Sequence, residues 1–269
     1  MNISVFKFEF RRHLRSVWNW ALASAAILFV FFAFFNTLSE QAALMNEVLA
    51  QFPEELLRAF GMSELNFASV LGYFSLVYLF IQLFLAIQAG NIGFGLVSIE
   101  ESELTADFLL TKPVSRRVVL TSKLLAALAA LLLTNLLVWP ASWGAVMLFR
   151  AQQSFEMSKL LLLFLALPLF QLFFLGVGLL VSLMVKRVRS VTPYSLGLAF
   201  GAYVLNAFGS VVGDVSMELL TPFKHFDAGA IVQRGGLDAK LVLPNLAFSL
   251  LCIAVSYVLY LRRDIHAVS

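Results

Sequence analysis

The side chains best placed to do chemistry gather in one charged segment between two apolar runs, residues 98–123 (SIEESELTADFLLTKPVSRRVVLTSK). Leu104 and Phe108 are four residues apart and share one face of a short helix, whereas Glu103 and Asp107 share an adjacent charged face. Pro113 then interrupts the helix before a basic stretch. The pattern predicts an amphipathic peg with an apolar anchor and an acidic border. An ordinary loop between two membrane spans is the alternative interpretation.

Residues for other kinds of chemistry are scattered or missing. The histidines His13, His225 and His266 are far apart, and Cys252 is the single cysteine, so neither a metal site nor an internal disulfide is expected. The sequence contains no Gly-x-x-x-x-Gly-Lys-Ser/Thr loop for nucleotide phosphates. We therefore expect no catalytic residue and no cofactor on this chain, and any ATP-driven work would need a separate chain.

The composition is that of an integral membrane protein. Hydrophobic residues make up 61% of the 269 residues, charged residues only 13%, and the mean hydropathy is +0.89. A net charge of +3 gives no support to nucleic acid as a partner. All 16 acidic residues can be placed in loops or at span ends, which disfavours a proton- or sodium-coupled carrier.

Apolar runs of membrane-crossing length predict six transmembrane helices in an all-α fold, with residues 1–269 forming a single domain. The predicted spans are 18–35, 70–99, 124–149, 160–185, 191–212 and 244–261. Segments 36–66 and 214–240 are predicted outer loops, and the second of them is apolar enough to dip back into the membrane. Residues 1–16 are amphipathic and basic, which predicts an interfacial helix on the membrane surface. A frayed, topology-setting N-terminus is the alternative.

The distribution of the 19 Lys and Arg residues predicts the orientation. Most of them lie at the two termini, in residues 98–123 or in the basic turn at 186–189, and cytosolic segments carry this excess. Both termini are therefore expected in the cytosol, in a multi-pass protein of the cell membrane.

Neutral polar residues within the spans are the candidates for a translocation path. They are Gln82, Gln88, Asn91 and Asn206, with Asn135 and Gln171 in other spans. Each could instead hydrogen-bond a neighbouring helix. Gly197 and Gly201 have the four-residue spacing of closely packed membrane helices, either within one subunit or in a dimer, unless the spacing is accidental. Gly90 and Gly93 likewise predict close packing of the second span.

The charged segment resembles the loop of type-2 ATP-binding-cassette exporter permeases. The residues that carry the resemblance are Glu100-Glu101, Thr105 to Leu110, Pro113-Val114-Ser115-Arg116 and Lys123, although Leu104 stands where that family usually has glycine. The resemblance implies that residues 98–117 form a cytosolic hairpin carrying a coupling helix. It implies ATPase-coupling roles for Glu100, Glu101, Glu103, Leu104, Asp107, Phe108, Pro113 and Arg116.

The same resemblance implies a function and a set of partners. The chain would be the permease subunit of an ATP-driven exporter, working with a dimeric cytosolic ATPase subunit that holds ATP and Mg. A second permease copy or a paralogue would complete it, and the second and fifth spans would line the path, which favours Gln88, Asn91 and Asn206. A non-transporting membrane scaffold or assembly protein, for which the hairpin docks another cytosolic partner, is the alternative. An ATPase encoded beside this chain would separate the two.

Overall fold

The computed structural model describes residues 1–41, 47–48, 51–53, 57, 66, 68–102, 115–150, 152–185, 188, 190–212 and 220–262, with backbone only at 99–102. Regular structure in these residues is helical, which confirms the all-α fold class. The helices are α1 (Ile3–Ala33), α2 (Phe35–Glu40), α5 (Val70–Ser102), α7 (Arg116–Phe149), α8 (Met157–Met184), α9 (Val191–Val212), α11 (Pro222–His225), α12 (Ala228–Arg234) and α13 (Ala239–Arg262).

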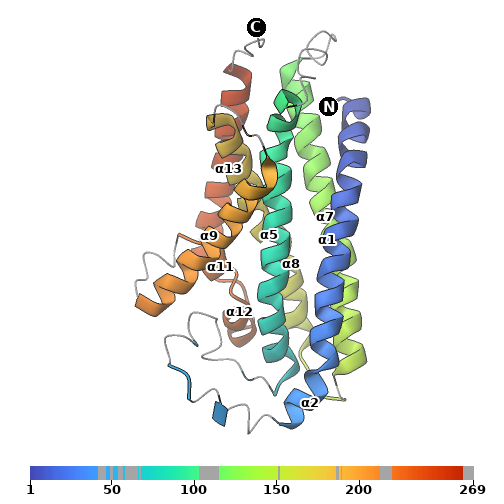
Figure 1. Ribbon diagram of the computed structural model, residues 1–269, viewed down its shortest axis with the longest axis vertical. Coiled ribbons are helices and arrows are strands. Elements are labelled where there is room, and N and C mark those ends of the chain that lie inside the picture. The colour runs from blue at the N-terminus through green and yellow to red at the C-terminus, as the bar shows by residue number, and fades with distance from the viewer. Residues whose placement is uncertain are drawn as a thin grey trace.

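Six of these helices are long and apolar enough to cross a membrane, as predicted: α1 with α2, α5, α7, α8, α9 and α13. Most run along the long axis of the bundle, whereas α9 runs obliquely to the others (Figure 1). The start of α1 and the end of α13 lie at the same end of the bundle (Figure 1), the arrangement that an even number of crossings requires. We refer to this as the terminal end.

The central helix is α5, which contacts α1, α7, α8, α9 and α12. In its most apolar stretch 72% of the residues are buried inside the protein, compared with 17% for α9. A helix that is apolar on all sides suits such a central position, and α5 carries rows of buried aromatic and aliphatic side chains such as Phe74, Tyr78, Ile81 and Leu85. The outer spans leave large apolar side chains exposed, as expected of helices that face lipid.

Small residues let α5 approach its neighbours closely. A Cβ on Gly93 would lie 2.5 Å from the carbonyl oxygen of Leu175 on α8. A Cβ on Gly178 of α8 would lie 3.2 Å from the carbonyl oxygen of Gly90, and a Cβ on Gly90 would lie 2.9 Å from the Cβ of Ser195 on α9. The backbones of α5 and α8 are therefore almost in contact, which confirms the prediction for Gly90 and Gly93.

The N-terminal segment is continuous with the first span and is not a separate helix ending at residue 16. α1 runs unbroken from Ile3 to Ala33 because no proline or glycine lies between those residues. Its first turns pack on protein: Glu9 is buried, and the backbone N–H of Asn2 donates to Ser122 Oγ on α7 at 2.8 Å. Lys7, Arg11 and Arg15 are exposed on the opposite side of these turns from Glu9.

Residues 222–234 pack against the spans: α11 contacts α8, α9 and α13, and α12 contacts α5 and α8. The rings of Phe223 and Phe226 lie edge-on to Phe170 of α8, with centroids 5.1 and 6.1 Å away. The side chain of Gln82 donates to the carbonyl of Phe226 at 2.9 Å. Gln82 is about 18 Å along the axis from Val70, at 1.5 Å per residue, so α11 and α12 lie well inside the bundle.

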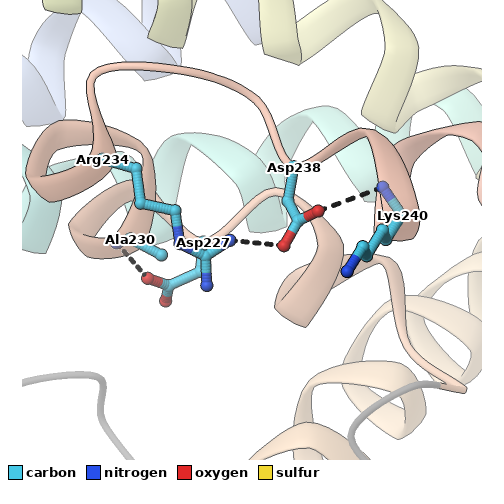
Figure 2. A network of polar contacts seen from close by, with 5 residues as sticks. All are labelled: Asp227, Ala230, Arg234, Asp238 and Lys240. Carbon is cyan, nitrogen blue, oxygen red and sulfur yellow. Dashed lines mark hydrogen bonds and ion pairs between the residues drawn. The ribbon is translucent and has the colours of Figure 1, made fainter.

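Polar side chains fix the ends of this short segment (Figure 2). Asp227 precedes α12 and accepts a hydrogen bond from the N–H of Ala230 at 2.7 Å. Arg234 donates to Asp238 Oδ2 at 2.6 Å, and Asp238 Oδ1 accepts from the N–H of Lys240 at 3.0 Å, at the start of α13. These hydrogen bonds therefore hold α12 and the turn that follows it in a defined conformation.

Candidate functional site

The end of α5 and the start of α7, which flank the predicted coupling hairpin in the sequence, lie at the terminal end of the bundle (Figure 1). Helix α5 ends at Ser102, and α7 begins at Arg116, directly after Ser115. Glu100 and Glu101 belong to the last turns of α5, where the structure describes the backbone alone. Most predicted coupling residues lie outside the described residues: Glu103, Leu104, Asp107, Phe108 and Pro113. Within 98–117 the structure therefore describes only the two ends, residues 98–102 of α5 and residues 115–117 at the start of α7, which include Arg116. We call these ends the two legs of the hairpin.

A buried ion pair lies at the base of the hairpin, by which we mean the region near the end of α5 and the start of α7. Lys123 on α7 donates to the carbonyl oxygen of Leu96 on α5 at 2.7 Å. Its Nζ lies 3.6 Å from Glu9 Oε1 on α1, and the two side chains are only 3% and 6% exposed. Three helices, α1, α5 and α7, thus meet at one ammonium group. Sequence reasoning missed the role of Glu9, although its position as the only acid among the basic residues of 1–16 was a signal.

Neutral side chains of α5, α7 and α8 form a chain of hydrogen bonds, which we call the amide chain. Asn135 Nδ2 donates to Gln171 Oε1 at 2.6 Å, and Gln171 Nε2 donates to Gln88 Oε1 at 3.5 Å. Gln88 Nε2 donates to Thr134 Oγ1 at 2.7 Å, and that hydroxyl donates to the carbonyl of Ala130 at 3.1 Å. All four side chains are fully buried. In a membrane these bonds satisfy polar groups that lipid cannot.

The four predicted path residues have different environments. Gln82 and Gln88 are buried and bonded to neighbouring elements of the same chain, so within one chain they hold helices together. Asn91 is partly exposed, and its Oδ1 accepts from Ser195 Oγ on α9 at 2.7 Å. Asn206 is also partly exposed, and its Oδ1 accepts from Thr221 Oγ1 at 3.2 Å. The structure therefore groups Asn91 and Asn206 with α9 and separates them from the amide chain.

Gly197 and Gly201 lie on the exposed side of α9. A Cβ added at either position would have no described neighbour within 4 Å. Close packing within one subunit, one of the three alternatives for these glycines, therefore does not occur in the described part of the chain. Large apolar side chains share the exposed surface of this helix, including Phe200, Val204 and Phe208.

The described residues contain no group of three or more His, Cys, Asp or Glu side chains placed to hold a metal ion. His225 faces Asn245, with His225 Nδ1 and Asn245 Nδ2 2.9 Å apart, and Cys252 is buried in α13. The polar groups of the hairpin base and of the amide chain make contacts between helices.

Replacing Gln171 by Leu should test the amide chain. Leu has a similar size but accepts nothing from Asn135 and donates nothing to Gln88, so buried polar groups lose their partners. We expect the folded protein to lose about 1–2 kcal/mol, because Gln171 makes two bonds between helices and each is worth roughly 0.6 kcal/mol or more. Thermal unfolding in one detergent would measure the loss, with Asn19→Leu on the exposed face of α1 as the matched control. Equal stability of Gln171→Leu and the wild type would contradict the prediction.

Comparison with known proteins gives one match. The model of the family described as ABC-2 family transporter protein matches residues 3–265, nearly the whole chain. Neither the curated proteins nor the solved structures contain a match.

Proposed function

Because this chain belongs to the ABC-2 family of transporter proteins, we propose that it is the permease subunit of an ATP-driven exporter of the cell membrane. Members of this family are transmembrane subunits of transporters, and these subunits are not themselves catalytic. A separate ATPase subunit hydrolyses ATP with Mg, and its work drives movement of substrate across the six spans. The observation that carries this proposal is the family match over residues 3–265.

Two features of the chain support the proposal that a separate subunit hydrolyses ATP. The sequence has no phosphate-binding loop, so the energy of ATP must arrive through a protein contact. The hairpin at 98–117 joins the central helix α5 to α7, and α5 contacts most of the other spans. A contact made on this hairpin would therefore act on the best-connected helix of the bundle.

We place the contact with the ATPase on the amphipathic peg. Leu104 and Phe108 would enter an apolar groove of the ATPase, and Glu101, Glu103 and Asp107 would face basic residues around that groove. The proposal rests on the sequence pattern and on the position of the two hairpin legs. Glu100, Pro113 and Arg116 complete the proposed coupling set by shaping the ends of the peg.

We also propose that two permeases, identical or paralogous, pair in the membrane. The exposed side of α9 supports this pairing, because Gly197 and Gly201 offer backbone that another helix can approach closely. Asn91 and Asn206 bond Ser195 and Thr221, which are buried, and Asn206 lies about 180° round α9 from Gly197, so the proposed path would run on the inner side of α9. Gln82 and Gln88 are then supports of that path within each subunit.

Affinity purification in mild detergent tests the proposed function. The tagged chain should bring down an ABC ATPase, and the mass of the complex should correspond to two permeases and two ATPase subunits. Addition of the permease should change the ATP hydrolysis rate of the ATPase. Recovery of a different cytosolic protein, with no ATPase, would instead favour the membrane scaffold.

The proposed orientation predicts which ends of the spans are accessible from outside. In a Cys252→Ser background, a cysteine at Ser154, before α8, should react with a membrane-impermeant maleimide on intact cells. A cysteine at Ser115, before α7, should react only after permeabilisation. Both positions are exposed, so burial does not limit the reaction. Labelling of position 115 on intact cells would overturn the orientation.

A further inference from the structure

The ion pair at the hairpin base joins α1 to α7 through charge. Lys123 Nζ lies 3.6 Å from Glu9 Oε1 and 2.7 Å from the carbonyl oxygen of Leu96. Lys123 is among the largest fully buried side chains of the protein, most of which are phenylalanines and leucines. Charges in such a position are retained only with good partners, because removing an ion from water is costly.

The position of the pair is mechanically significant. Leu96 lies just before the hairpin, and Lys123 is at the end of segment 98–123, so this contact joins the two legs where they enter the bundle. Glu9 belongs to α1, which is far away in sequence. Near the start of α1, the N–H of Asn2 donates to Ser122 Oγ at 2.8 Å, so the chain has a second directed contact with α7 beside Lys123.

We infer that Glu9 and Lys123 form a charged clamp through which the hairpin moves α1 together with α5 and α7. Apolar packing between helices has no preferred direction and resists sliding weakly, whereas Lys123 donates a directed hydrogen bond to the Leu96 carbonyl and attracts the Glu9 carboxylate at 3.6 Å. The first turns of α1 are thus part of the transmission element, although they contribute nothing to the peg. This inference rests on the proposed function, since it assigns a role in receiving work from the ATPase.

A double variant tests the clamp without leaving a buried charge unpaired. Glu9→Gln with Lys123→Met removes both charges, keeps side chains of similar length, and leaves the peg untouched. A single Lys123→Met change would remove the Lys123 charge from beside the buried Glu9 and could simply misfold. The charge reversal Glu9→Lys with Lys123→Glu restores attraction between α1 and α7 alone, because a carboxylate at position 123 cannot donate to the Leu96 carbonyl. Tyr73→Phe is the matched control, because it removes one cross-helix bond to α1, from Tyr73 Oη to the carbonyl of Phe31, at the opposite end of the bundle.

Distances between spin labels give the readout. Labels at Ser4 on α1 and at Leu125 on α7, in a Cys252→Ser background, occupy exposed positions near the clamp. In the wild-type complex with its ATPase, the distance should be the same without nucleotide and after vanadate trapping, because α1 follows α7. In the double variant the distance should shift on trapping, because α7 moves and α1 lags behind. The reversed pair should behave like the wild type, and so should Tyr73→Phe.

The outcomes separate the clamp from the proposed function. If no ATPase co-purifies with the wild type, the proposed function fails. The same labels in the permease alone, in nanodiscs, then test the clamp: a broader distance distribution in the double variant than in the wild type and the reversed pair supports it, and equal distributions overturn it. If the ATPase binds and the double variant keeps the wild-type distance in both nucleotide states, the inference is overturned. A nucleotide-dependent shift in Tyr73→Phe would also overturn it, because loss of any bond to α1 would then suffice.

Discussion

A Phe108→Asp protein should reach the membrane like the wild type and bind its ATPase at least about tenfold more weakly. Burial of a phenylalanine side chain is worth roughly 1.5–3 kcal/mol. An aspartate in the same groove would lose this packing and would also carry a charge away from water, which adds a further penalty. The change should therefore separate the permease from its source of work while the spans remain folded.

Co-purification and ATPase stimulation measure the effect of Phe108→Asp. Phe108→Leu is the matched control, because it keeps an apolar anchor and should retain most of the binding. Single changes of the acidic border, such as Glu101→Ala, should cost about 1 kcal/mol or less, as exposed charge pairs do. A Phe108→Asp protein that is inserted normally, binds its ATPase and stimulates hydrolysis at the wild-type rate would contradict the proposal that the peg is the contact.

Gly93→Leu should damage folding more than the loss of any hydrogen bond in the amide chain. The added Cβ would lie 2.5 Å from the carbonyl oxygen of Leu175. Neither atom can rotate out of the way, because the Cβ is fixed to the backbone of α5 and the carbonyl is part of the backbone of α8. Helices α5 and α8 would have to move apart along their shared surface, at a cost of about 3 kcal/mol, the upper part of the usual overpacking range. We expect little folded protein in detergent.

Size-exclusion profiles and thermal unfolding would measure this loss. Gly144→Leu on α7 is the matched control, because a Cβ at Gly144 would meet no described atom within 4 Å. The control should give a wild-type profile. A Gly93→Leu protein as stable as Gly144→Leu would show that α5 and α8 tolerate a wider separation.

The number of spans could be predicted from the sequence because it depends on a local property, the length of each apolar run. The close approach at Gly90 and Gly93 could also be predicted, since small residues on a membrane helix have few other uses. The partners of polar residues could not. Nothing local in the sequence shows that Gln88 meets Thr134 and Gln171, because these contacts depend on how α5, α7 and α8 are arranged.

The first helix shows why an amphipathic pattern is ambiguous. A helix on a membrane surface and a helix with one face on protein both alternate apolar and basic residues. The apolar face of residues 3–16 therefore predicts an interfacial helix, whereas the structure continues these residues into α1. The sequence likewise groups Lys123 with the cations that flank a span, and only the three-dimensional structure brings Glu9 to it.

The pairing of α1 with α7 has a consequence for the order in which the chain is assembled in the membrane. α1 packs mainly along α7, whereas its contact with α5, the next span in sequence, is smaller. During synthesis the first span therefore enters the lipid long before its main partner exists. Glu9 cannot meet Lys123 until the whole of α5 and the start of α7 have been made. Until the third span is inserted, the first span is surrounded by lipid or by the insertion machinery. In a chain truncated before α7, Glu9 would be without Lys123.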